Sequence, residues 1–163
     1  MRNVKDIGIR RVFIGGARGA GAFISPQQFE WFYFPWLKKA VETFAANDII
    51  SLLHFDRNWT LNLPYFRELP KGKCILETDG TTDIFKAKQV LGGHMCLMGD
   101  VPATLFKLGT PQQVEAYCRR LIDVVGKGGG FILSSGCEVP HDAEFENIKA
   151  MIDIGMTYPL SKS

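Results

Sequence analysis

The chain has 163 residues and a formal net charge of +2, which allows one domain with a hydrophobic core of its own. Hydrophobic residues make up 46% and charged residues 22%, as in folded globular proteins and unlike disordered or membrane-embedded ones. No apolar run approaches the ~18–20 residues of a membrane span, the basic residues form no stripe, and the N-terminus lacks the apolar stretch of a signal peptide. The four cysteines lack disulfide-framework spacing. We therefore expect a cytoplasmic protein whose partners include neither membrane nor nucleic acid.

Five short apolar runs predict buried β-strands. They are continuous runs and not alternations, which is typical of a parallel sheet covered on both faces. In chain order they occupy residues 11–14, 52–53, 74–76, 95–98 and 130–133. Each run ends abruptly in polar side chains that are able to do chemistry. In a (β/α) barrel, the carboxyl ends of the strands form the face where the chemistry occurs.

Helical patterns separate these runs. Two capping boxes with proline at the first helical position, Ser25–Gln28 and Thr110–Gln113, predict helix starts. The first helix should cover residues 26–46 with a kink at Pro35, and the second should stop at Gly126. Further helices are predicted over residues 83–91, 103–107 and 145–158.

Strands that alternate with helices, without hairpin signals, require parallel crossover connections. Five strands fall short of the eight of a closed barrel. Two architectures fit: a flavodoxin-like open sheet, or the C-terminal part of a larger barrel. An open five-stranded part would leave two unpaired edges and an exposed barrel interior.

Six motifs follow one another along the chain: Phe29–Leu37, Leu53–His54, Gly99–Pro102, Gly109–Val114, Gly129–Pro140 and Glu146–Ile148. In these motifs and their order, over about residues 13–158, the chain resembles the C-terminal half of the uroporphyrinogen decarboxylase (URO-D) superfamily, and is closest to its corrinoid-dependent methyltransferase branch. The resemblance implies an α/β fold of the TIM (β/α)8-barrel type, of which only the C-terminal five or so βα units are here. We expect residues 1–163 to form a single URO-D-like domain, completed by a missing N-terminal half-barrel or by a homodimer.

The superfamily contains two chemistries. Its decarboxylases, enzymes of porphyrin biosynthesis, remove acetate carboxyl groups from a tetrapyrrole without metal or cofactor, and typically have His where this chain has Cys137. Its methyltransferases hold zinc through a His-x-Cys pair on one strand end and a Cys on the last. There the zinc lowers the pKa of a thiol, which takes a methyl group from methyl-cobalt. The resemblance places His54 and Cys137 on two of these ligands, with Asp56 replacing the first Cys.

Zinc accepts imidazole, carboxylate and thiolate ligands, so His54, Asp56 and Cys137 could hold it with a fourth position open. Residues two apart in a strand face the same side, which lets His54 and Asp56 enter one site. Glu77, one strand along, is a candidate for a further ligand or a hydrogen-bond partner of His54. The alternatives are that His54 is an ordinary strand-end residue and Cys137 an inert thiol.

Four more residues are candidates for binding the substrate or cofactor. Asp79 and Asp100 end predicted strands, where they either line the pocket or cap the following helices. Asn58 either hydrogen-bonds the substrate or lies in a solvated loop. Arg18 lies in a glycine-rich loop without phosphate-loop spacing, and is available for a carboxylate or a phosphate.

The leading hypothesis is zinc-dependent methyl transfer between a corrinoid (methylcobamide) and a thiol-type acceptor. Cys137, His54 and Glu77 would be the catalytic residues, and a corrinoid protein or a tetrapyrrole-like small molecule the partner. One alternative is a metal-free uroporphyrinogen decarboxylase of tetrapyrrole biosynthesis, against which Cys137 argues. Another is a half-barrel subunit or binding module without activity alone.

Overall fold

A five-stranded parallel sheet forms the centre of the computed structural model, which describes residues 8–159. Its strands are β1 (Arg11–Gly16), β2 (Ile50–Phe55), β3 (Cys74–Thr78), β4 (Cys96–Val101) and β5 (Phe131–Ser135). The order in the sheet follows the chain, β1-β2-β3-β4-β5, and every neighbouring pair is parallel. A flavodoxin-like sheet has the order 2-1-3-4-5. The sequential order is that of a barrel wall, so the structure confirms the partial (β/α) barrel.

The helices begin where the sequence signals predicted. The Ser25 hydroxyl accepts the Gln28 N–H while the Gln28 side chain accepts the Ser25 N–H, and Thr110 and Gln113 form the same capping box. The helices are α1 (Pro26–Gln28), α2 (Phe34–Ala46), α3 (Ile84–Leu91), α4 (Ala103–Leu108), α5 (Pro111–Arg120) and α6 (Phe145–Thr157). None of the helices within residues 8–159 is long and apolar enough to cross a membrane.

A π-helical turn, η2 (Phe29–Tyr33), joins α1 to α2 at the position of the predicted kink. The Phe34 N–H donates to the Phe29 carbonyl, five residues back. Pro35, at the start of α2, has no N–H and its ring crowds the preceding turn, so a regular α-helical ladder cannot pass through it. A second π-turn, η4 (Leu121–Val125), ends the helix that begins with α5, and Gly126 follows it as predicted.

The connection from β2 to β3 is a 3-10 helix, η3 (Thr60–Glu68), which the sequence did not predict. Its buried apolar residues Leu63 and Phe66 lie three positions apart, as the 3-10 period requires, and Pro64 interrupts any α-helical pattern. A search for a 3.6-residue period therefore finds no signal in this segment.

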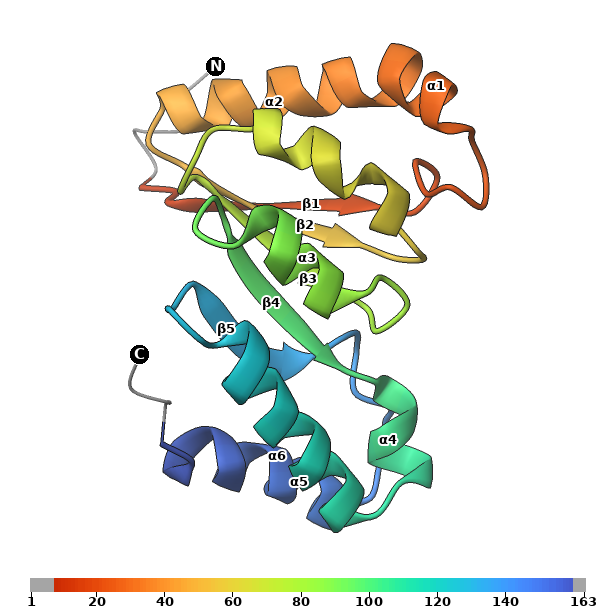
Figure 1. Ribbon diagram of the computed structural model, residues 1–163, viewed down its shortest axis with the longest axis vertical. Helices are drawn as coiled ribbons and strands as arrows, with labels where there is room; N and C mark the ends of the chain where they lie inside the picture. Colours follow the sequence, from red (N-terminus) through yellow and green to blue (C-terminus); the bar gives the residue numbers. More distant parts are fainter. Residues whose placement is uncertain (1–7, 160–163) are drawn as a thin grey trace.

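The helices follow the curve of the sheet from α2 at one end of the molecule to α6 at the other (Figure 1). Strand residues on the helix side, such as Leu53, Leu76 and Leu97, are almost fully buried in the core. On the opposite face, Phe13 and Ile132 are 63% and 41% exposed. That face corresponds to the interior of a closed barrel.

Candidate metal centre

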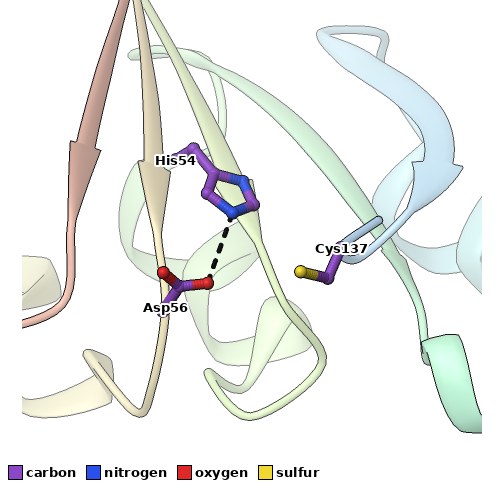
Figure 2. Close-up of side chains that lie close together, drawn as sticks. All are labelled: His54, Asp56 and Cys137. Carbon is purple, nitrogen blue, oxygen red and sulfur yellow. Dashed lines mark ion pairs between the residues drawn. The ribbon is translucent and has the colours of Figure 1, made fainter. Parts of the chain in front are cut away.

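Three predicted ligands converge at the carboxyl ends of the strands. His54 lies in β2, Asp56 directly follows β2, and Cys137 lies two residues beyond β5. One ligand atom from each lies within 4.8 Å of the others. Figure 2 shows the imidazole, the carboxylate and the thiol around one common space.

The curvature of the sheet is what brings these residues together. Two strands, β3 and β4, separate β2 from β5. In a flat sheet, three strand spacings would put β2 and β5 about 14 Å apart. Cys137 reaches His54 because the sheet curves and the chain after β5 turns over the strand ends. The cluster is therefore a product of the barrel-type fold.

The imidazole of His54 is held on both sides. Its Nδ1 lies 2.8 Å from Oε2 of Glu77, the residue opposite it on β3, and its Nε2 lies 3.3 Å from Oδ1 of Asp56. The Phe13 ring stacks on the imidazole, with 5.6 Å between centroids. A proton on Nδ1 donated to Glu77 leaves the Nε2 lone pair directed toward Asp56 and Cys137, as a metal ligand requires.

The donor set fits a zinc-like ion. Tetrahedral coordination with metal–ligand distances of 2.0–2.3 Å separates the ligand atoms by about 3.3–3.8 Å. The three ligand atoms, now within 4.8 Å of one another, would need to move only slightly closer to reach this separation. Three protein ligands and one open position are typical of catalytic zinc sites. The contact between His54 and Glu77 matches the carboxylate–histidine pair that commonly orients such a ligand.

Asp100 lies apart from this cluster. It is only 2% exposed, and its Oδ1 accepts a hydrogen bond of 2.8 Å from the Tyr117 hydroxyl of α5. Burial raises the pKa of the Asp100 carboxyl from 3.8 to about 6. It does not cap the following helix, because Pro102 occupies the N-cap of α4. The predicted role in the pocket stays a prediction.

The Asp79 carboxylate is hydrogen-bonded to nearby protein groups. Its carboxylate accepts hydrogen bonds from the Arg57 N–H and from the N–H and hydroxyl of Thr81. The N-cap of α3 is Asp83, not Asp79. Sequence reasoning found the position of Asp79 at a strand end but missed its backbone partners, because the Arg57 contact joins loops that follow different strands.

Arg18 and Asn58 lie on exposed loops after β1 and β2, at the same edge of the sheet as the cluster. The Arg18 guanidinium lies 5.6 Å from the centroid of the Phe23 ring. Asn58 Oδ1 accepts the Thr60 N–H at 2.9 Å. Their predicted contacts with a substrate stay predictions.

The fold and the site define a partial (β/α) barrel with a candidate catalytic metal centre at the carboxyl ends of its strands. A family model described as uroporphyrinogen decarboxylase (URO-D) matches residues 12–158. The chain belongs to the URO-D family, which confirms the resemblance inferred from its motifs.

Relatives of the chain include both chemistries of the family. It is 28% identical over 130 residues to a uroporphyrinogen decarboxylase of Trichodesmium erythraeum. The matched region covers 77% of this chain and 35% of that protein. It is 24% identical over 135 residues to the methylcobamide:CoM methyltransferase MtbA of Methanosarcina mazei, and this match covers 83% of the chain and 38% of MtbA. The chain thus spans little more than a third of the length of these relatives.

A solved structure supports the fold assignment. A methyltransferase from Methanosarcina mazei superposes on 91% of this chain with a TM-score of 0.71, and the match covers 42% of that protein. At 19% identity the likeness establishes the architecture alone.

Proposed function

We propose that the chain carries the zinc site of a methyltransferase that moves a methyl group from a corrinoid to a thiol-type acceptor. The observation behind this proposal is the convergence of His54, Asp56 and Cys137 within 4.8 Å at the carboxyl edge of the sheet. The name of the relative MtbA, a methylcobamide:CoM methyltransferase, supports a corrinoid as the methyl donor. The free cysteines suit a reducing compartment, and we propose the cytoplasm.

Each residue of the site would have a distinct role in binding zinc. Zinc, when bound, lowers the pKa of a thiol placed in the open position. His54 would offer Nε2, Asp56 a carboxylate oxygen and Cys137 its thiolate. Glu77 would accept the Nδ1 proton of His54 and keep the imidazole in the ligand tautomer.

The transfer itself is a displacement at the methyl carbon. The acceptor sulfur forms a bond to that carbon as the cobalt–carbon bond breaks, and the electron pair of the broken bond stays on cobalt. The proton of the acceptor thiol passes to solvent. Arg18 and Asn58, exposed at this edge of the sheet, would contact the acceptor or the corrinoid. The Asp79 and Asp100 carboxylates already hydrogen-bond protein groups, and their predicted place in the pocket stays a prediction.

Two other functions have an observation in their favour. A metal-free decarboxylase is supported by the Trichodesmium erythraeum relative. Against it stands Cys137, at a position where the family resemblance implies His in decarboxylases. A half-barrel subunit that is inactive alone is supported by the partly exposed apolar face of the sheet. Neither accounts for the cluster of three zinc-type ligands.

The test is the metal content of the purified chain and of its Cys137→Ala variant, after circular dichroism has shown that both are folded. We expect about one zinc per chain, lost in the variant. Cys96→Ala, which changes a cysteine outside the cluster, is the matched control and should keep its zinc. A folded wild-type chain without metal would contradict the proposed zinc site and favour a metal-free decarboxylase or a half-barrel subunit that is inactive alone.

The chemistry needs a second measurement. The zinc-loaded chain is mixed with methylcobalamin and a simple thiol, and the visible absorbance of the corrinoid is followed. Loss of the methyl-cobalt spectrum that depends on both the thiol and Cys137 is the expected result. An unchanged spectrum with every thiol tried would count against methyl transfer by this chain.

A further inference from the structure

Asp79 occupies the turn after β3, between the loops that carry Asp56 and Cys137. Its Oδ2 accepts the Arg57 N–H at 2.8 Å. Its Oδ1 accepts the N–H of Thr81 at 2.9 Å and the Thr81 hydroxyl at 2.6 Å. Both carboxylate oxygens therefore accept hydrogen bonds from protein groups, and one of these donors, Arg57, directly follows the candidate ligand Asp56.

The contact with Arg57 lies next to Asp56 in the chain. The Arg57 N–H belongs to the peptide unit that joins these two residues, so a bond to it fixes the plane from which the Asp56 side chain extends. Arg57 has a φ of 77°, in the left-handed region that residues with a Cβ rarely adopt. The hydrogen bond from its N–H to the Asp79 carboxylate stabilises this conformation.

A second contact from the same turn holds the other side of Arg57. The Thr82 hydroxyl donates to the Arg57 carbonyl at 2.9 Å and accepts the Trp59 N–H at 3.0 Å. Thr82 is buried, as is Trp59. The peptide units before and after Arg57 are thus both fastened to the turn that contains Asp79.

The loop of Cys137 packs against the backbone of the same turn. A Cβ placed on Gly136 would lie 2.9 Å from the carbonyl carbon of Asp79 and 3.1 Å from its Cα. Only glycine permits this approach of the two backbones. The Gly136 N–H also donates to the Val101 carbonyl at 2.8 Å, which secures the loop to the end of β4. Cys137 is the next residue in the chain.

We infer that Asp79 is a positioning residue, which holds Asp56 and Cys137 within reach of one metal ion. It acts through the Arg57 N–H on one side and through its backbone contact with Gly136 on the other, and does not itself touch the ion. Outer partners of metal ligands typically change metal affinity 10–100-fold when mutated. The inference rests on the proposed metal site and adds the device that assembles it.

The test compares Asp79→Asn with Asp83→Asn. The first keeps the shape of the side chain but turns one acceptor oxygen into an NH2 donor, so the Arg57 N–H and Thr81 cannot both be accepted. The second makes the same change at the N-cap of α3, where Asn serves equally well. Zinc affinity is measured by chelator competition, and ligand geometry by the visible spectrum of the cobalt(II)-substituted chain.

A third readout needs no metal: hydrogen exchange of the Arg57 amide in the metal-free chain. Asp79→Asn should bind zinc 10–100-fold more weakly, alter the cobalt spectrum and speed Arg57 exchange at least tenfold, while Asp83→Asn leaves all three unchanged. Gly136→Ala disturbs the support from the side of Cys137. It should weaken zinc binding and leave Arg57 exchange unchanged.

The outcomes separate this inference from the proposed function. If the wild-type chain binds zinc and Asp79→Asn matches it in all three readouts, the inference is overturned and the metal site stands. If the wild-type chain binds no metal, the proposed zinc function fails. Positioning of ligands for a metal ion then fails with it, and Arg57 exchange decides only the local contact: faster exchange in Asp79→Asn shows that Asp79 holds the Asp56–Arg57 peptide, and unchanged exchange overturns that as well.

Discussion

The His54 imidazole shows how much the site depends on single contacts. Glu77 holds Nδ1 at 2.8 Å, and this bond determines which nitrogen is free to bind a metal. We expect Glu77→Gln to weaken zinc binding about tenfold, because an amide oxygen is a poorer acceptor than a carboxylate. Chelator competition measures the effect. Glu68→Gln, on the exposed Glu68–Lys38 pair, is the control, and an equal loss there would refute a specific role for Glu77.

Asp100 makes the stability of the chain depend on pH. Burial raises its pKa from 3.8 to about 6, so the folded chain binds this proton more tightly than the unfolded chain between these values. Its contribution to stability is therefore present at about pH 4 and is lost as the pH rises through about 6. Asp100→Asn cannot ionise and keeps an oxygen that accepts the Tyr117 hydroxyl.

We expect the difference in unfolding free energy, Asp100→Asn minus wild type, to rise by about 2 kcal/mol between pH 4 and pH 7. Urea unfolding at the two pH values measures this difference. Asp153→Asn, an exposed carboxylate on α6, should show no comparable trend. A pH-independent difference for Asp100→Asn would mean that Asp100 ionises freely in the folded chain.

At the scale of elements, the helices take part of their stability from their first turns. The capping box of α5 satisfies two backbone N–H groups, those of Thr110 and Gln113. Thr110→Ala removes one of these bonds and should lower the unfolding free energy by about 1 kcal/mol, as judged by urea unfolding. Thr157→Ala deletes an exposed hydroxyl at the end of α6 and should cost less than about 0.5 kcal/mol. Equal losses would show that the box adds nothing.

At the scale of the whole molecule, the exposed side of the sheet is the feature without an internal partner among residues 8–159. Phe13 and Ile132 are large apolar side chains on this face, and β1 and β5 each pair with one neighbour only. Such faces and edges favour association with another chain. We expect the 18.2 kDa chain to self-associate with rising concentration in sedimentation experiments.

A charge on this face should oppose that association. Ile132→Lys is expected to shift the distribution toward monomer, whereas Leu108→Lys, at the exposed end of α4, should leave it unchanged. A wild-type chain that stays monomeric at every concentration would contradict the expectation, and would indicate that the sheet face is stable in water as it stands.

The sequence by itself determined the features that depend on near neighbours. Capping boxes and the glycine that ends a helix are set by contacts within a few residues, and a buried strand leaves a continuous apolar run in the sequence, so the positions of these elements could be predicted. The polar residues at strand ends, His54 and Asp56 among them, followed from the same pattern. The 3-10 helix η3 was not predicted, because its three-residue period differs from the 3.6-residue period of an α-helix.

Only the tertiary structure decided how these pieces meet. The sequential strand order and the curvature of the sheet bring Cys137 to His54, and no local pattern encodes either; the sequence pointed to this arrangement only through the family resemblance. The same holds for the burial of Asp100 against Tyr117 and for the bond from Arg57 to Asp79. Each joins segments that are distant in the chain. Such contacts form only when the packing of the whole sheet and its helices outweighs the entropy lost in closing the loops between them.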